Sequence, residues 1–211
     1  MTPADTMSGR LIDRLPPVRG RYRENADLSR ITWFGVGGPA EVMFRPADAE
    51  DLAHFLEARP ADVEVTVIGV GSNLLVRDGG VPGVVIRLGR EFAGIDATGT
   101  AIIAGAGALD SSVAKVSAAS GITGLEFLAG IPGTIGGALR MNAGAYDREM
   151  KDVVTEAEAI APDGRRHTLT NEALGFSYRN TTVPQDWVFV SAKLQGEPGS
   201  PDDITQRIEK I

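Results

Sequence analysis

The apolar positions of this chain alternate between strand-like and helix-like spacings, and glycines separate the segments. EVMFRP forms an apolar run that predicts a strand leading into Pro46. In the next segment, DAEDLAHFLEARP, Leu52, Phe55 and Leu56 follow the i, i+3, i+4 spacing of a helix, and Asp48 is placed to cap it. VEVTVIG, GVVIRL and TAIIAGAG are rich in β-branched residues, which predicts three further strands, each bounded by glycine.

The second half of the chain continues this alternation and then becomes mostly strand. LDSSVAKVSAASG is typical of a helix, which we expect Asp110 to cap and Gly121 to close. VVTEAEAIAPDGRRHTLT predicts a β-hairpin around PDGR, a strong turn sequence, and WVFVSAKLQ predicts one more strand. The pattern therefore predicts an α+β chain whose two blocks meet near residue 90.

The two ends of the chain differ from these blocks. Residues 1–30 form a polar leader with a short helical piece, and the last residues begin a helix with Ser200 as N-cap and Pro201 in the first turn. Ile204, Ile208 and Ile211 form an apolar stripe that is unfinished at the last residue. Such a helix can dock on its own domain, but we expect it to lead to a further segment. The expected divisions are 1–30, 31–90, 91–196 and 197–211.

Composition and charge narrow the function. Hydrophobic residues make up 43% of the chain, enough for a globular core, and the net charge of −7 argues against nucleic acid as a partner. The absence of cysteine excludes disulfides and thiolate catalysis, and two isolated histidines, His54 and His167, make no metal site. We expect no signal peptide in the N-terminal residues, which carry scattered charges and no apolar segment. The longest charge-free run in the glycine-rich region, 13 residues between Glu126 and Arg140, is shorter than the roughly 20 of a membrane span. We expect a cytoplasmic protein.

Two glycine-rich loops carry the candidate chemistry. GVGSNLL follows a predicted strand, and GLEFLAGIPGTIGGALRMNAGAY, residues 124–146, holds six glycines and only two charged residues. Glycine lets backbone N–H groups approach a ligand, and successive N–H groups form concave sites for anions, to which Ser72 and Thr134 add hydroxyl donors. One such loop would be more typical of a tight turn, whereas two favour a phosphate-bearing ligand. Because the chain shows no dense Lys/Arg cluster, the backbone would hold a diphosphate.

Two common nucleotide motifs do not account for these loops. No lysine follows a glycine, so the Walker loop is excluded. GVGGPA, residues 35–40, fits the loose dinucleotide pattern, but the segment after it predicts a strand where that motif requires a helix. GVGSNL lacks the third glycine. A classical nicotinamide-binding half is therefore not expected.

Four segments together resemble a known family. TWFGVGGPAEV, GVGSNLLVRDGGVPGVVIRL, GLEFLAGIPGTIGGALRMNAGAY and FSYRN occur in the order and at about the spacing found in bacterial UDP-N-acetylenolpyruvoylglucosamine reductases. The resemblance covers roughly residues 10–195. It implies an FAD-binding domain of the vanillyl-alcohol-oxidase (PCMH) type, in which 31–90 and 91–196 are two α+β subdomains with FAD between them.

The resemblance also assigns residues to the site. It implies that the first loop holds the diphosphate and that the second lines the diphosphate, ribityl chain and flavin. Arg179 corresponds to the family's active-site arginine, and Tyr178 is a packing neighbour or a substrate contact. We expect Glu126, beside the second loop, to be structural, with a contact to the flavin ring as the alternative. The cofactor-binding residues so implied are Gly69, Gly71, Ser72, Asn73, Leu74, Ile131, Pro132, Gly133, Thr134, Gly136, Gly137, Ala138, Asn142, Gly144 and Ala145.

The implied reaction is NADPH-dependent reduction of UDP-N-acetylglucosamine enolpyruvate to UDP-N-acetylmuramate, for peptidoglycan synthesis, by a monomer without metal. Arg179 would stabilise the enolate that develops on the substrate carboxylate. The family's proton-donor serine motif and its later glutamate are absent. We therefore expect a truncated chain that lacks the C-terminal substrate domain and is inactive alone. The alternatives are a non-catalytic FAD-binding module and another oxidase of the same FAD superfamily.

Overall fold

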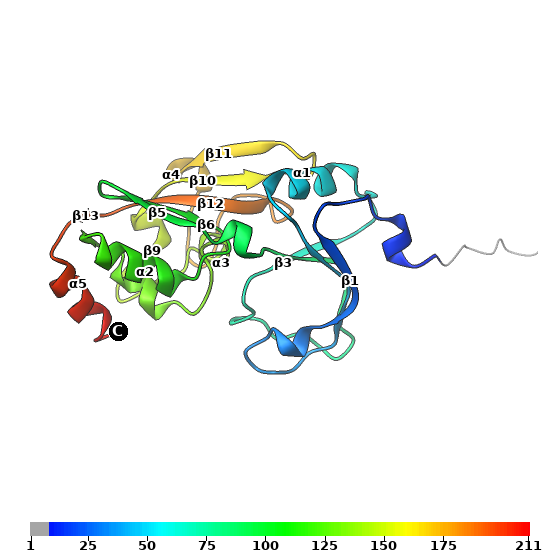
Figure 1. Cartoon of the computed structure of the whole chain (residues 1–211), viewed down its shortest axis with the longest axis horizontal. Coiled ribbons are helices and arrows are strands. Elements are labelled where there is room, and N and C mark those ends of the chain that lie inside the picture. The colour runs from blue at the N-terminus through cyan, green and yellow to red at the C-terminus, as the bar shows by residue number, and fades with distance from the viewer. Residues whose placement is uncertain (1–8) are drawn as a thin grey trace, which may run out of the picture.

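The first of two main β-sheets has four strands, in the order β1-β2-β4-β3. Figure 1 labels β1 and β3 of this sheet. The structure, a computed structural model, describes residues 9–211. The strands are β1 (Arg21–Asp27), β2 (Pro39–Arg45), β3 (Val65–Ile68) and β4 (Val81–Arg87). β2 and β3 run parallel to β4, and β1 is antiparallel to β2. The predicted strands are confirmed, but the leader prediction is wrong for 21–27, which form an edge strand; its first eight residues lie outside the described range.

Both faces of this sheet pack against apolar clusters. Successive side chains of β2 point to opposite faces and enter different clusters. Val42 and Phe44 lie in one cluster with the helix α1 (Ala49–Ala58), and Met43 lies in the other. The rings of Phe44 and Phe55 are 4.6 Å apart. Asp48 caps α1 as predicted, since its carboxylate accepts a hydrogen bond from the backbone N–H of Asp51.

The second sheet has five antiparallel strands in the order β11-β10-β12-β6-β5. They are β5 (Ile95–Thr98), β6 (Ala101–Gly105), β10 (Val154–Ile160), β11 (Arg166–Thr170) and β12 (Val188–Gln195). The predicted hairpin is confirmed as β10 and β11, whose turn contains Gly164 at φ +77°. Ile160, Val188 and Val190 of this sheet pack in the same cluster as Phe44, so the two sheets share part of one core.

Two helices cover the main core cluster of the second sheet, α2 (Asp110–Ala119) and α3 (Ile135–Arg140). The expectation that Asp110 caps α2 is wrong. Leu109 is the N-cap, Asp110 is the first helical residue, and no side chain makes a capping bond. The helix does end before Gly121, which adopts φ +66° and donates to the carbonyl of Ala118.

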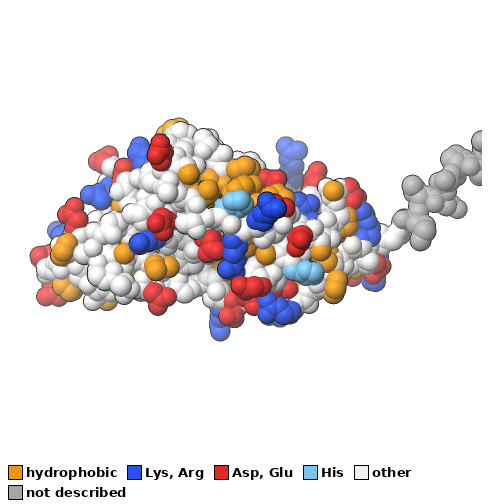
Figure 2. Space-filling view, turned by 90° about the horizontal axis from the view of Figure 1, so that it is seen from above, with side chains coloured by type: hydrophobic (Ala, Val, Ile, Leu, Met, Phe, Trp, Pro, Cys, Tyr) orange, Lys and Arg blue, Asp and Glu red, His pale blue; other side chains and the backbone are white. Residues whose placement is uncertain are grey.

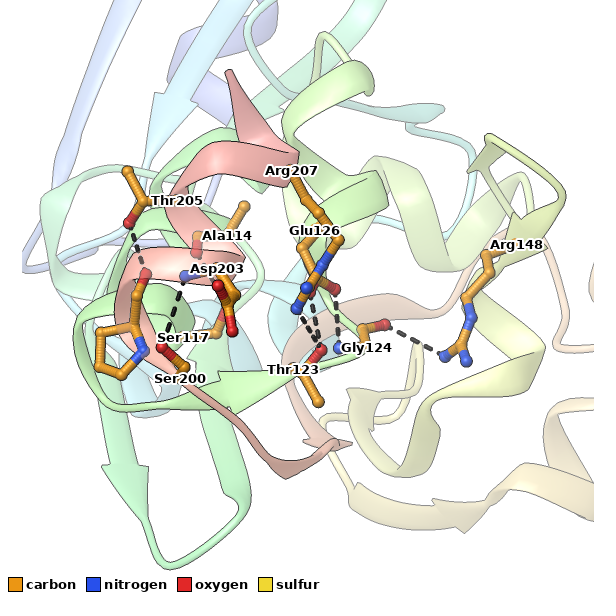
Figure 3. Close-up of polar contacts among 11 residues, drawn as sticks. Ala114, Ser117, Thr123, Gly124, Glu126, Arg148, Ser200, Asp203, Thr205 and Arg207 are labelled. Atoms are coloured by element: carbon orange, nitrogen blue, oxygen red, sulfur yellow. Dashed lines mark hydrogen bonds and ion pairs between the residues drawn. The ribbon is translucent and has the colours of Figure 1, made fainter. Parts of the chain in front are cut away.

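The last helix, α5 (Pro201–Ile208), packs on α2 and on the short helix η4 (Glu126–Gly130). Ile204 is fully buried and Ile208 packs against the main core cluster, so the isoleucine stripe docks on this chain. Figure 3 shows the Arg207 side chain pointing from α5 toward Glu126 and Thr123. Its guanidinium donates to the carboxylate of Glu126 at 2.8 Å and to the hydroxyl of Thr123 at 2.9 Å. This ion pair ties α5 to the start of the second glycine loop.

The other short elements connect these parts. They are η1 (Leu11–Arg14), η2 (Leu28–Arg30), η3 (Arg90–Phe92), β7 (Ile122–Thr123), β8 (Gly144–Ala145), β9 (Arg148–Glu149), η5 (Met150–Asp152), α4 (Asn171–Leu174) and β13 (Glu197–Pro198). None of the helices between residues 9 and 211 combines the length and the apolar character that a bilayer crossing requires.

Candidate functional site

A cleft of about 690 Å³ opens where the two glycine loops meet. Its walls come from β3 and the loop after it, the segment 130–144, the residues that follow β4 and β6, and the segments around Arg179 and 185–189. Both blocks of the chain therefore contribute to one cavity, whose volume lies in the range typical of small-molecule sites.

The two loops touch each other although they are far apart in the sequence. A Cβ on Gly69 would lie 2.7 Å from the hydroxyl oxygen of Thr134, and a Cβ on Gly133 would lie 3.9 Å from that of Ser72. A β-bridge between Leu109 and Thr134 holds the second loop against the start of α2. The small side chains thus let two stretches of backbone approach closely across the cleft.

Two glycines show what the missing side chains achieve. Gly71 adopts φ +71°, and a Cβ there would lie 2.7 Å from the carbonyl oxygen of Ile31, so the turn requires glycine. Gly137 in α3 is different, because a Cβ at this position meets no atom within 4 Å. It would project into open space in a position that lines the cleft. At Gly137 the wall of the cleft is therefore backbone with open space beside it. This shape fits a long, flat cofactor.

Most of the residues that the sequence assigns to the site line this cleft, and three do not. Asn142, Ala145 and Tyr178 lie outside its lining. The residues brought together are Gly69, Gly71, Ser72, Asn73, Leu74, Ile131, Pro132, Gly133, Thr134, Gly136, Gly137, Ala138, Gly144 and Arg179.

Asn142 is buried, and other parts of the chain use its side-chain amide. The amide nitrogen donates to Glu149 at 2.9 Å and to the carbonyl of Ser177 at 3.1 Å, and the amide oxygen accepts from the backbone N–H of Lys151. Ala145 pairs with Arg148 in the β8–β9 ladder. Asn142 therefore ties the second loop to Glu149, Lys151 and Ser177.

Arg179 lines the cleft from a tight turn. Ser177 and Asn180 exchange two backbone hydrogen bonds of 3.0 and 3.2 Å, which leaves Tyr178 and Arg179 at the tip. Arg179 adopts φ +51°, a region that costs a non-glycine residue of order 1–3 kcal/mol. Tyr178 is 86% exposed. The turn thus holds the arginine in a strained backbone conformation at the edge of the cleft.

Two further arginines line the cleft, Arg87 at the end of β4 and Arg140 at the end of α3. Burial lowers the pKa of Arg87, and the nearby charge of Arg45 lowers it further. Burial also lowers the pKa of Arg140. The sequence contains no dense Lys/Arg cluster, but the fold brings three arginines that are far apart along the chain to the lining of one cleft.

Arg140 is held in place by carbonyl groups. Its guanidinium donates to the carbonyls of Val183, Pro184 and Trp187, and it lies 4.8 Å from the centre of the Phe189 ring. These neutral partners fix the side chain without cancelling its charge. Its position at the last turn of a helix that follows a glycine loop is the sequence signal that could have identified it.

Asp110 is the acidic residue of the cleft lining, and it is fully buried. Neither carboxyl oxygen has a hydrogen-bond partner. Burial raises the pKa of Asp110 to about 8, so the group is mainly neutral at pH 7. With Asp110 neutral, the three arginines make the cleft positive inside an acidic protein, which suits an anionic ligand.

The other ionisable residues considered above lie elsewhere. His54 is exposed on α1, and His167 stacks on Trp187 with ring centres 4.3 Å apart; Figure 2 shows the two histidines as separate patches among mixed charges. Glu126 is paired with Arg207 outside the cleft lining. Within residues 9–211, His, Asp and Glu side chains form no group of three or more that could hold a metal ion.

Comparison with known protein families identifies the cofactor class. Residues 40–170, more than half of the chain, match the model of an FAD binding domain. Among curated proteins, the UDP-N-acetylenolpyruvoylglucosamine reductase of Rhodospirillum rubrum is 60% identical over 201 residues, and that of Parvibaculum lavamentivorans is 59% identical. Each match covers 95% of this chain and, respectively, 63% and 65% of the relative. The chain therefore spans less than two thirds of these relatives' length.

Solved structures show the same relationship in three dimensions. UDP-N-acetylenolpyruvylglucosamine reductase from Thermus caldophilus superposes with a TM-score of 0.78 at 35% identity, over 92% of this chain and 68% of that one. A cholesterol oxidase variant from Brevibacterium sterolicum superposes with a TM-score of 0.64 at 17% identity, over 87% of this chain and 40% of that one. The second likeness shows a shared fold alone. Together with the family model and the first structure, it confirms the predicted α+β architecture of an FAD-binding domain.

Proposed function

Because the chain belongs to the family of UDP-N-acetylenolpyruvoylglucosamine reductases and contains an FAD-binding domain, we propose that the cleft between its two sheets holds FAD. The observation that carries the proposal is the meeting of two glycine loops at one positive cleft with an open backbone wall at Gly137. In this proposal, 31–90 and 91–196 are the two subdomains that enclose the cofactor.

The two loops would bind different parts of the cofactor. Backbone N–H groups of the first loop, from Gly69 to Leu74, would bind the diphosphate together with the hydroxyl of Ser72. The second loop, from Ile131 to Ala138 with Gly144, would line the diphosphate, the ribityl chain and the flavin. Arg87 and Arg140 add positive charge to the same cleft and would favour the anionic part of FAD.

For the full-length protein we propose the reaction of the family, the NADPH-dependent reduction of UDP-N-acetylglucosamine enolpyruvate to UDP-N-acetylmuramate in peptidoglycan synthesis, by a cytoplasmic monomer. Bound FAD would supply the hydride transfer. Arg179 would face the substrate carboxylate and stabilise the negative charge that develops on it, because a guanidinium stays charged and binds carboxylates in a fixed geometry.

The proposal separates what these 211 residues do from what the longer relatives do. FAD binding is proposed for this chain, since the matched domain and both loops lie within it. Sugar reduction is proposed for the full-length protein, because more than a third of the relatives' length has no counterpart here. We therefore expect these 211 residues to bind FAD.

Flavin titration tests the proposal. When flavin-free protein is titrated with FAD, the flavin fluorescence should be quenched on binding. The titration should saturate at one FAD per chain. Under anaerobic conditions, NADPH should then bleach the flavin absorbance, and a longer protein with the rest of the relatives' length should form UDP-N-acetylmuramate.

Each part can fail separately. The absence of saturable FAD binding would refute the cofactor site. FAD binding without reduction by NADPH would favour a non-catalytic module, and oxidation of alcohols with oxygen would favour another oxidase.

A further inference from the structure

Asp110 stands out among the buried polar groups of residues 9–211. Apart from the Nε of Arg59, its two carboxyl oxygens are the only buried side-chain polar atoms there without a hydrogen-bond partner. The same fold satisfies another buried acid, Asp51, whose carboxylate accepts hydrogen bonds from the backbone N–H groups of Arg19, Gly20 and Ala47. An unpaired buried carboxyl costs stability, so the contrast points to a partner that binds in the cleft.

The position of Asp110 indicates where such a partner would lie. Its backbone N–H donates to the carbonyl of Gly133 at 3.2 Å, and its Oδ2 is 3.0 Å from the point where a Cβ on Gly133 would sit. The same point is 3.9 Å from the hydroxyl of Ser72 in the other loop. The carboxyl therefore lies between the two loops and lines the cleft.

The groups around Asp110 favour the protonated form of its carboxyl. In the two loops, the groups placed close to it are the backbone of Gly133 and the hydroxyl of Ser72, and neither of them titrates. The charged residues that line the cleft are Arg87, Arg140 and Arg179, and burial alone accounts for the raised pKa of about 8. At pH 7 the carboxyl is thus mainly a hydrogen-bond donor.

We propose that Asp110, in its protonated form, donates a hydrogen bond to an anionic oxygen of the FAD diphosphate. The proposal rests on the proposed function, since it assigns a further binding residue to the same cleft. A carboxylate in this place would repel the diphosphate in a desolvated site, whereas a neutral carboxyl adds a short, strong donor to the backbone amides. Binding of FAD therefore requires that proton.

The affinity for FAD should therefore depend on pH in a defined way. Below about pH 8 the proton is already present, and the affinity for FAD stays constant. Above that pH a proton must be taken up on binding, so the affinity falls by up to tenfold per pH unit. Asp110→Asn keeps a donor and cannot ionise, so its affinity should stay within a few-fold of wild type at pH 7 and show no such fall. Asp110→Ala should bind FAD more weakly at pH 7.

The experiment measures the FAD dissociation constant of flavin-free protein by fluorescence titration from pH 6 to 9.5 at constant ionic strength. Asp202→Asn, which alters an exposed acid in the first turn of α5, serves as the control and should follow wild type. Circular dichroism at each pH establishes that every variant is folded. The expected result is a ratio of wild-type to Asp110→Asn affinity that is constant below pH 8 and falls above it.

Two results would overturn the proposal while leaving the FAD site intact. One is the same pH profile for wild type and Asp110→Asn. The other is weak binding by Asp110→Asn at pH 7 together with a wild-type affinity that rises with pH, since the carboxylate would then be an acceptor. If wild type binds no FAD at any pH, both the proposed function and this inference fail.

Discussion

At the scale of single residues, Arg179 combines a strained backbone with a place at the edge of the cleft. The two properties can be separated by two substitutions. Arg179→Lys keeps the positive charge but loses the planar guanidinium, and Arg179→Gly relieves the positive φ but removes the side chain. A catalytic role and a structural role for this residue therefore predict different outcomes.

In a full-length protein of this family, Arg179→Lys should lower kcat/KM for the enolpyruvyl sugar by an amount equivalent to about 3 kcal/mol. It should leave the dissociation constant of FAD unchanged. Arg179→Gly should be at least as stable as wild type. Its kcat/KM should be no higher than that of Arg179→Lys. Steady-state kinetics and flavin titration measure the two effects. An equal loss of FAD binding and of sugar reduction in Arg179→Lys would contradict the catalytic assignment.

Asp110 also predicts a pH-dependent stability of the flavin-free protein. The pKa of its carboxyl rises from an ordinary 3.8 to about 8 on folding, so the folded state binds the proton more tightly. Its stabilising contribution is present below about pH 4 and is lost as the pH rises toward 8, at about 1.4 kcal/mol per unit. Asp110→Asn removes this loss. Urea unfolding should show the variant more stable than wild type by a few kcal/mol at pH 8.5, with a smaller difference at pH 5; a difference independent of pH would contradict the assignment.

At the scale of elements, α3 carries a glycine where a helix would prefer alanine. Gly137→Ala should stabilise the protein by about 0.5–1 kcal/mol, since alanine is the better helix former and the new Cβ meets no atom within 4 Å. The same methyl group projects into the cleft and should weaken FAD binding. Gly94→Ala, which also meets open space but lies outside the cleft lining, is the matched control. Unchanged FAD affinity in Gly137→Ala would place the cofactor elsewhere.

The contact between α5 and η4 makes a second prediction at this scale. Arg207→Ala removes two hydrogen bonds to Glu126, whose side chain is only 12% exposed, and one to Thr123. We expect a loss of about 1–2 kcal/mol in urea unfolding. Arg10→Ala breaks an exposed pair with Asp13 and should change little. Equal effects of the two substitutions would mean that α5 is not anchored through this pair.

At the scale of the whole molecule, the cleft joins residues of both sheets, so a bound ligand should stabilise the fold as a unit. FAD at about 100 times its dissociation constant should raise the free energy of unfolding by about 2.7 kcal/mol. Thermal melts with FAD and with riboflavin, which lacks the phosphates, would measure this. If the loops bind the diphosphate, FAD should stabilise more than riboflavin at equal concentration; equal shifts would argue against phosphate binding there.

The sequence by itself determined the local elements and the polarity of the loops. Helical spacing at Leu52, Phe55 and Leu56, the turn at Gly164 and the cap at Asp48 are set by neighbours along the chain, and each is confirmed. The family motifs, which are also local stretches, identified the FAD-binding domain that the comparisons confirm. Backbone geometry and side-chain size within a few residues are enough for such features.

Only the tertiary structure decided what each side chain faces. It brought Arg87 and Arg140 into one cleft, left Asp110 buried without a partner and turned Asn142 toward Glu149. It also added residues 21–27 to the first sheet as an edge strand. These outcomes depend on desolvation and on partners far away in the sequence. No local pattern encodes them, because burial and pairing exist only once distant elements have packed.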